Sequence, residues 1–125
     1  MITDETVQVT TTEAGFVHVL HRQMHDSGID MGGHLWFDRD NLGWVIATLR
    51  QCVSAYGFPG AQEQRGADSL KIFESGPEQA PIINIQNRRA KDQAHGGVYA
   101  LLFSKPKAEA ELLKELEQLR DAEAT

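Results

Sequence analysis

The stretch DRDNLGWVIATLRQCVSAYG, residues 38–57, has the most regular hydrophobic pattern in the chain, and the other elements are placed around it. Its apolar side chains recur every three or four residues, which is the period of an α-helix with one buried face. Asp38 or Asp40 can cap its first turn, and Gly57 can end it in the left-handed conformation. The stretch therefore predicts an amphipathic helix whose buried face consists of Leu42, Val45, Ile46, Leu49, Val53 and Tyr56, with Cys52 as a buried, unreactive thiol among them.

A second helix is predicted at the C-terminal end of the chain. Ser104 can cap it, and Pro106 falls in its first turn. Its leucines form a narrow stripe with charged flanks: Leu112, Leu113, Leu116 and Leu119. Such a stripe can pack on a sheet or pair with a second copy of itself. We prefer the sheet, because a coiled coil needs at least about three heptads.

Short apolar runs bounded by turn residues predict strands before and after the first helix. SLKIFESG (69–76) and APIINIQNRR (80–89) flank a Gly-Pro turn and indicate a hairpin. GGVYALLFS (96–104) is apolar on both faces, so we expect it at the centre of the sheet. GGHLWFD (32–38) leads into the first helix, and the polar, glycine-rich segment 57–68 is interpreted as a connection.

The stretch FVHVLHRQMH, residues 16–25, is compatible with two conformations. A helix would place His18, His21 and His25 within about 60° of one another. A strand would place His18 on one face and the other two histidines on the opposite face. The alternating TVQVTT before it and the turn sequence TEAGF favour a β-hairpin, so we predict a strand and no convergence of the three histidines.

These elements predict one α+β domain over residues 1–125. Their order is β-β-β-α-β-β-β-α, and they form a mostly antiparallel sheet of about six strands with two helices on one face. The composition, with 41% hydrophobic and 24% charged residues, is that of a globular protein.

Composition also limits the classes of partner and compartment. No apolar run approaches the roughly 18 residues that cross a bilayer, and the N-terminal residues do not resemble a secretory leader. One cysteine excludes an internal disulfide and a zinc site with several thiolates. We therefore expect a cytoplasmic protein without a membrane partner. The net charge of −6 argues against nucleic acid as a partner.

No catalytic motif is recognisable, and we expect no cofactor. Neither GxSxG nor GxxxxGK[ST] occurs in the chain. A metal site built from His18, His21 and His25 would need the fold to add Asp26 or His34, and it remains only a third hypothesis. The basic segment with Arg88, Arg89 and Lys91 is able to hold a phosphate or a carboxylate.

The strongest functional signal is a set of side chains opposite the predicted core. If Leu35, Phe37, Ile83 and Ile85 face the core, alternation turns five residues the other way: His34, Trp36, Asn84, Gln86 and Arg88. Trp44 likewise lies about 160° from the apolar stripe of its helix. Tryptophan beside arginine, asparagine and histidine is typical of a recognition surface.

We therefore expect a small, non-catalytic cytoplasmic protein that binds another protein, as an inhibitor, immunity factor or adaptor does. The alternative is a binding protein or enzyme for an anionic small molecule, held on the polar sheet face with Arg88 as the anion clamp. We also expect a homodimer, with Trp44 or the C-terminal leucines in its interface.

Overall fold

The computed structural model describes residues 2–30 and 32–123, which form two antiparallel sheets and two helical regions. A three-stranded sheet contains, in chain order, β1 (Ile2–Thr11), β2 (Phe16–His25) and β3 (Gly33–Asp38). A four-stranded sheet contains, also in chain order, β4 (Ala61–Arg65), β5 (Asp68–Ser75), β6 (Ile82–Arg89) and β7 (Gly97–Ser104). Between the sheets in the chain comes α1 (Leu42–Ser54). The C-terminal helix consists of α2 (Lys105–Lys107), a π-helical turn (Ala108–Leu112) and α3 (Leu113–Glu123).

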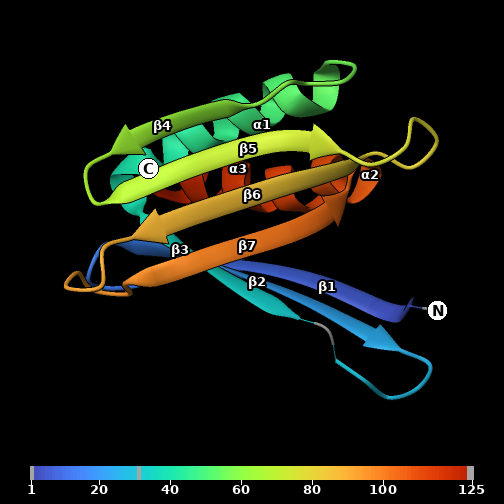
Figure 1. The fold of residues 1–125 in the computed structure, drawn as a ribbon. Coiled ribbons are helices and arrows are strands. Elements are labelled where there is room, and N and C mark those ends of the chain that lie inside the picture. The colour runs from blue at the N-terminus through green and yellow to red at the C-terminus, as the bar shows by residue number, and fades with distance from the viewer. Residues whose placement is uncertain (1, 31, 124–125) are drawn as a thin grey trace.

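Both helical regions lie on one face of the four-stranded sheet, and the opposite face of that sheet is uncovered (Figure 1). The three-stranded sheet continues beyond β7, and its β1–β2 hairpin extends away from the helices (Figure 1). These observations confirm the predicted α+β class and the two helices on one face. The observed order is β-β-β-α-β-β-β-β-α, so the described residues contain one strand more than the predicted order.

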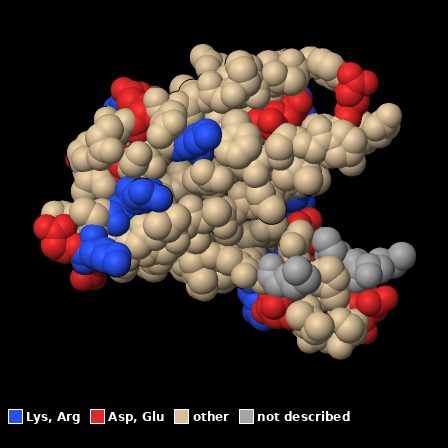
Figure 2. Space-filling view, in the orientation of Figure 1, with Lys and Arg blue, Asp and Glu red and all other residues tan. Residues whose placement is uncertain are grey.

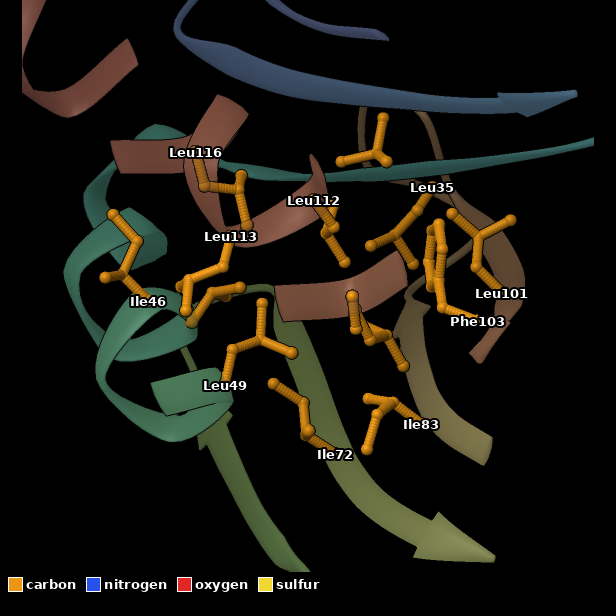
Figure 3. Close-up of a cluster of buried hydrophobic side chains, with 14 of the residues drawn as sticks. Leu35, Ile46, Leu49, Ile72, Ile83, Leu101, Phe103, Leu112, Leu113 and Leu116 are labelled. Carbon is orange, nitrogen blue, oxygen red and sulfur yellow. The ribbon is translucent and has the colours of Figure 1, made fainter. Parts of the chain in front are cut away.

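One hydrophobic core joins the two sheets to the two helices. Its side chains come from α1, the C-terminal helix and the inward faces of both sheets (Figure 3). The predicted core residues Leu35, Phe37, Ile83 and Ile85 are all fully buried in it. Leu112, Leu113 and Leu116 are buried there too, which confirms that the leucine stripe packs on the sheet.

The first helix follows its sequence signals except at its end. Asp38 Oδ1 accepts a hydrogen bond from the backbone N of Asp40 (2.9 Å) and so caps a short 3₁₀ turn, Arg39–Asn41, that leads into α1. The helix ends at Ser54, and Ala55 is extended. Tyr56 therefore lies outside the helix and is 76% exposed, so its predicted place in the buried stripe is wrong.

Residues 16–25 form a strand, as predicted. The turn before it is closed by Thr12 N donating to Phe16 O (2.9 Å), and Gly15 adopts the left-handed conformation (φ +87°) that this turn requires. Val17 and Val19 are buried, whereas His18 lies on the outer face. His18 and His21 therefore point to opposite faces of the sheet.

Two strand predictions are wrong for related reasons. β7 is an edge strand of its sheet, and the apolar side chains on its outer face, Val98 and Leu102, are exposed because that face is uncovered. β4 forms within the segment interpreted as a connection. It is the other edge strand, and its sequence AQEQR lacks apolar alternation because most of its side chains are exposed.

Trp44 was expected to stand exposed on the back of α1, and this is wrong. The side chain is half-buried and packs against the core cluster. With Leu112, Leu113 and Leu116 also buried, the two apolar patches that motivated a homodimer are partly covered within one chain. The dimer itself stays a prediction.

Candidate functional site

The uncovered face of the four-stranded sheet holds three of the five predicted site residues. Cross-strand pairing places Asn84, Gln86 and Arg88 of β6 on this face with the outward residues of β4, β5 and β7. No outward position of these four strands carries an acid, and two carry cations, Lys71 and Arg88. Figure 2 shows this face largely without charge, with Lys and Arg side chains on it and most Asp and Glu side chains near its rim.

Gln86 and Arg88 line a shallow hollow on this face. Its volume is about 320 Å³, and its lining comprises Gln62, Ser69, Lys71, Gln86, Asn87, Arg88 and Val98. Lys71 pairs with Gln86 across the β5–β6 ladder, and Ser69 pairs with Arg88. The Nζ atom of Lys71 also lies 4.9 Å from the centroid of the Phe73 ring, a cation–π distance. The hollow therefore combines two cations with amide and hydroxyl groups.

Asn84 has a structural role instead. It is only 6% exposed, and its Nδ2 donates to Ser75 Oγ (2.7 Å) and to the backbone oxygen of Phe73 (3.4 Å). These bonds satisfy a buried amide between two strands, so the side chain of Asn84 has little exposed surface and no free N–H group for contact with a partner.

The exposed apolar side chains of the same face lie on β7. Val98 is 70% exposed and Leu102 is 55% exposed. Val98 lies opposite Arg88 in the β6–β7 ladder, and Leu102 lies opposite Asn84. Sequence reasoning missed both residues because it assigned β7 to the centre of the sheet.

The other two predicted site residues, His34 and Trp36, belong to the three-stranded sheet. They lie in a line of aromatic rings that we call the imidazole row: His34, His18, Trp36 and His95. The indole of Trp36 is sandwiched between His18 (4.1 Å between centroids, 14° between planes) and His95 (3.9 Å, 4°). Nε2 of His18 lies 2.8 Å from Nδ1 of His34, a hydrogen-bond distance between nearly parallel rings.

The imidazole row is formed by cross-strand pairing and by one turn. His18 lies opposite Trp36 in the β2–β3 ladder, and His34 follows one pair further along on the same face. His95 comes from the β6–β7 turn, residues 90–96, where it has a positive φ of 56°. Tyr99 Oη donates to its backbone oxygen (2.8 Å), and the Phe16 ring packs edge-on against its imidazole (4.8 Å). The sequence could not reveal this convergence, because His95 is far from the others in the chain.

A buried polar network lies beneath the row and ties the sheets together. Asp68 of β5 is fully buried and forms an ion pair with Arg89 of β6. Its carboxylate also accepts hydrogen bonds from Asn41 Nδ2 (2.7 Å), Asn87 Nδ2 (3.0 Å) and the backbone N of Asp38 (2.8 Å). Arg89 was expected in an exposed basic patch, and that part of the prediction is wrong.

The pKa of His18 and the pKa of Glu5, which bonds to His21, are both lowered by their surroundings. Burial lowers the pKa of His18, and the nearby His34 and His95 lower it further, because a second or third positive charge there is unfavourable. His21 is buried on the other face, where it hydrogen bonds to Glu5 (2.7 Å) and stacks on Phe103. Burial alone would raise the pKa of Glu5, but hydrogen bonds from His21 and Gln23 outweigh it, so the pKa lies below its usual value.

The described part of the chain contains no group of three or more His, Cys, Asp or Glu side chains arranged to hold a metal ion. Cys52 is fully buried, and burial raises its pKa to about 11, so it is a thiol at neutral pH. Within residues 2–30 and 32–123, no helix combines the length and the apolar character needed to cross a bilayer.

A larger, mostly apolar cleft opens where β7 meets the C-terminal helix. Its volume is about 970 Å³, and β2 contributes Gln23 to its wall. Leu102 lines this cleft, so the cleft adjoins the uncovered sheet face. Glu109 and Ala110 of the π-helical turn line it as well. None of the predicted site residues lies in its wall.

Fold and surfaces together define an α+β protein with two antiparallel sheets, in which the face of the four-stranded sheet opposite the helices is open. The chain matches no protein-family model, and no curated protein is similar to it at a significant level. Its function therefore has to be argued from its own residues.

Proposed function

We propose that this is a non-catalytic protein-binding protein that docks on an acidic partner protein through the uncovered face of its four-stranded sheet. The observation that carries the proposal is the composition of that face. It presents Val98 and Leu102 beside Lys71 and Arg88, and its outward positions carry no acid in a chain of net charge −6.

The two kinds of side chain have different roles in this proposal. Fully burying a Val or Leu side chain contributes about 1.5–3 kcal/mol, so covering Val98 and Leu102 supplies affinity. Lys71 and Arg88 supply orientation, because an acidic partner is repelled by most of this molecule and attracted only where the cations lie. Gln86 keeps its predicted role at the hollow. His34 and Trp36 lie in the imidazole row of the other sheet.

An inhibitor, immunity factor or adaptor of the cytoplasm fits these properties. Such proteins need a rigid face and no catalytic group, cofactor or metal. The one cysteine of the chain cannot form an internal disulfide, which is compatible with a reducing compartment.

A second candidate function is the binding of a small anion in the hollow between Lys71 and Arg88. The specific observation in its favour is that both cations line one hollow with Gln62, Ser69 and Gln86. A guanidinium and an ammonium at one site can hold a phosphate or a carboxylate.

The test is capture of a partner from a cell extract with matched surface variants. Arg88→Glu and Leu102→Ser change the proposed face, whereas Lys114→Glu changes an exposed charge on the C-terminal helix, behind the sheet. We expect a protein that is retained by the wild type and by K114E and lost with R88E and with L102S. Equal retention by all four chains would refute the proposal. Loss with R88E alone, together with saturable binding of inorganic phosphate by calorimetry, would favour the small-anion function.

A further inference from the structure

The imidazole row is not used by the proposed function, and its chemistry points to a separate role. We propose that the row is a pH-operated latch that holds the β6–β7 turn, residues 90–96, on the three-stranded sheet and opens when His18 and His34 both carry a proton. The inference rests on the geometry of the row and does not depend on protein binding through the other sheet.

The contact between His18 and His34 tolerates one added proton but not two. In the neutral pair, one ring nitrogen donates its N–H and the other accepts with its lone pair across 2.8 Å. One added proton leaves a donor and an acceptor in place and strengthens the bond by charge. A second added proton makes both nitrogens donors, so two N–H groups would face each other between two cations. The contact then has to break, and the two rings titrate as a coupled pair.

Breaking the His18–His34 contact affects the β6–β7 turn through Trp36. His18 covers one face of the indole and His95 covers the other, so the turn is attached to β3 by ring stacking. A single protonated His95 keeps this contact, because an imidazolium over an indole is a cation–π pair. Protonation of His18 and His34 as well would put three positive charges along one row. Separation of the rings relieves that repulsion.

The surrounding groups do not offset this charge. Thr10 of β1 lies opposite His18, and Asp38 of β3, on the same face, already caps Asp40. Arg22 of β2 is paired with Asp30, and Arg89 of β6, whose guanidinium lies 4.9 Å from the Phe16 ring centroid, is paired with Asp68. In the turn itself, Lys91 and Asp92 are exposed and of opposite charge. Among the described residues, no acid hydrogen bonds to an imidazole of the row.

The direction of the pH effect follows from these contacts. The latch is closed above the pKa of a free imidazole, about 6.5, and it stays closed while the His18–His34 pair holds only one added proton. It opens at the lower pH at which the pair takes up its second proton, and the opened turn exposes Trp36. The rest of the fold keeps its core, because no core side chain takes part in the stack.

Trp36 is the reporter in the first experiment. In a Trp44→Phe background, acrylamide quenching of the remaining tryptophan is measured between about pH 7.5 and about pH 4.5. We expect the quenching constant to rise about two-fold as the half-buried ring becomes exposed, with an unchanged far-ultraviolet circular dichroism spectrum. The rise should be absent in His34→Gln, because a glutamine amide takes no second charge. It should persist in His25→Gln, whose imidazole lies outside the row.

The wild-type chain supplies an independent second measurement that does not depend on the Trp44 change. Carbon–proton correlation spectra of the histidine rings should show the signals of His18 and His34 changing as those of a coupled pair. A constant quenching constant across this pH range would overturn the proposal, as would the same rise in H34Q, independent titration of the two rings, or loss of the dichroism spectrum at the pH of opening.

Discussion

Removing one partner of the buried Asp68–Arg89 ion pair tests the polar network that joins the two sheets. Asp68 is fully buried, and its carboxylate is bonded to groups from β3, from the 3₁₀ turn and from β6. In Arg89→Leu that carboxylate keeps its neutral donors but loses its only ion-pair partner among the described residues. Breaking a buried pair on one side costs about 3–5 kcal/mol, because the remaining charge stays in a medium of low polarity.

That cost is large relative to the whole stability of a domain of this size. The free energy of unfolding of such domains is about 5–15 kcal/mol. We therefore expect R89L to shift the midpoint of urea unfolding far below that of the wild type, or to prevent folding. Asp68→Leu should have a similar effect, because it leaves the guanidinium of Arg89 buried without its counter-charge.

The double variant D68L/R89L separates a pair effect from a general packing effect. Replacing both charges by apolar groups removes the uncompensated charge, so the double variant should lose less stability than the sum of the two single variants. Asp92→Asn, in the exposed β6–β7 turn, is the control and should change the free energy of unfolding by less than about 0.5 kcal/mol. Single variants that lose less than about 1 kcal/mol, or an additive double variant, would refute this account of the network.

Three further predictions concern single side chains. Glu5→Gln should lower the free energy of unfolding by about 1 kcal/mol at pH 7, because an uncharged amide replaces the carboxylate that bonds to His21 and Gln23. The pKa of Glu5 is lowered in the folded protein, so the difference from wild type should begin to shrink as the pH falls below the usual value of 4.5 and vanish below the lowered pKa. A gain of stability at pH 7 would contradict it. Cys52, with its pKa raised to about 11 by burial, should resist a thiol reagent at pH 8 until the protein unfolds, whereas fast labelling of the native protein would disprove burial. Trp36→Ala should lower stability by about 1–3 kcal/mol, since two ring contacts worth about 0.5–1.5 kcal/mol each are lost; retention of full stability in thermal unfolding would show that the row contributes nothing.

Periodicity along the chain was a reliable guide to which face a side chain takes. Leu35 and Phe37 are buried as the alternation predicted, and His34 and Trp36 point the other way. Ile83 and Ile85 are buried as the alternation predicted, and Gln86 and Arg88 point the other way. These assignments succeed because a strand has a period of two and a buried face selects one register.

Such patterns do not show which strands pair with each other. β3 forms a strand ladder with β2 but only side-chain hydrogen bonds and packing contacts with the four-stranded sheet, so the predicted single sheet is two sheets. Consequently the five predicted site residues divide between two surfaces. Val98 and Leu102 are exposed because the outer face of the four-stranded sheet is uncovered, and an apolar strand looks the same in sequence whether that face is covered or open.

The latch and the buried network hold the same turn with contacts of very different strength. Arg89 Nε donates to the backbone oxygen of Ala94 (3.0 Å) from below, while His95 stacks on Trp36 above. The stacking contacts are worth about 0.5–1.5 kcal/mol each, and the buried pair beneath them resists removal of a partner by about 3–5 kcal/mol. The turn therefore opens locally well before the two sheets separate. Amide hydrogen exchange should show this order, with residues 90–96 exchanging at a lower free energy than β5 and β6, and acidification should widen the difference.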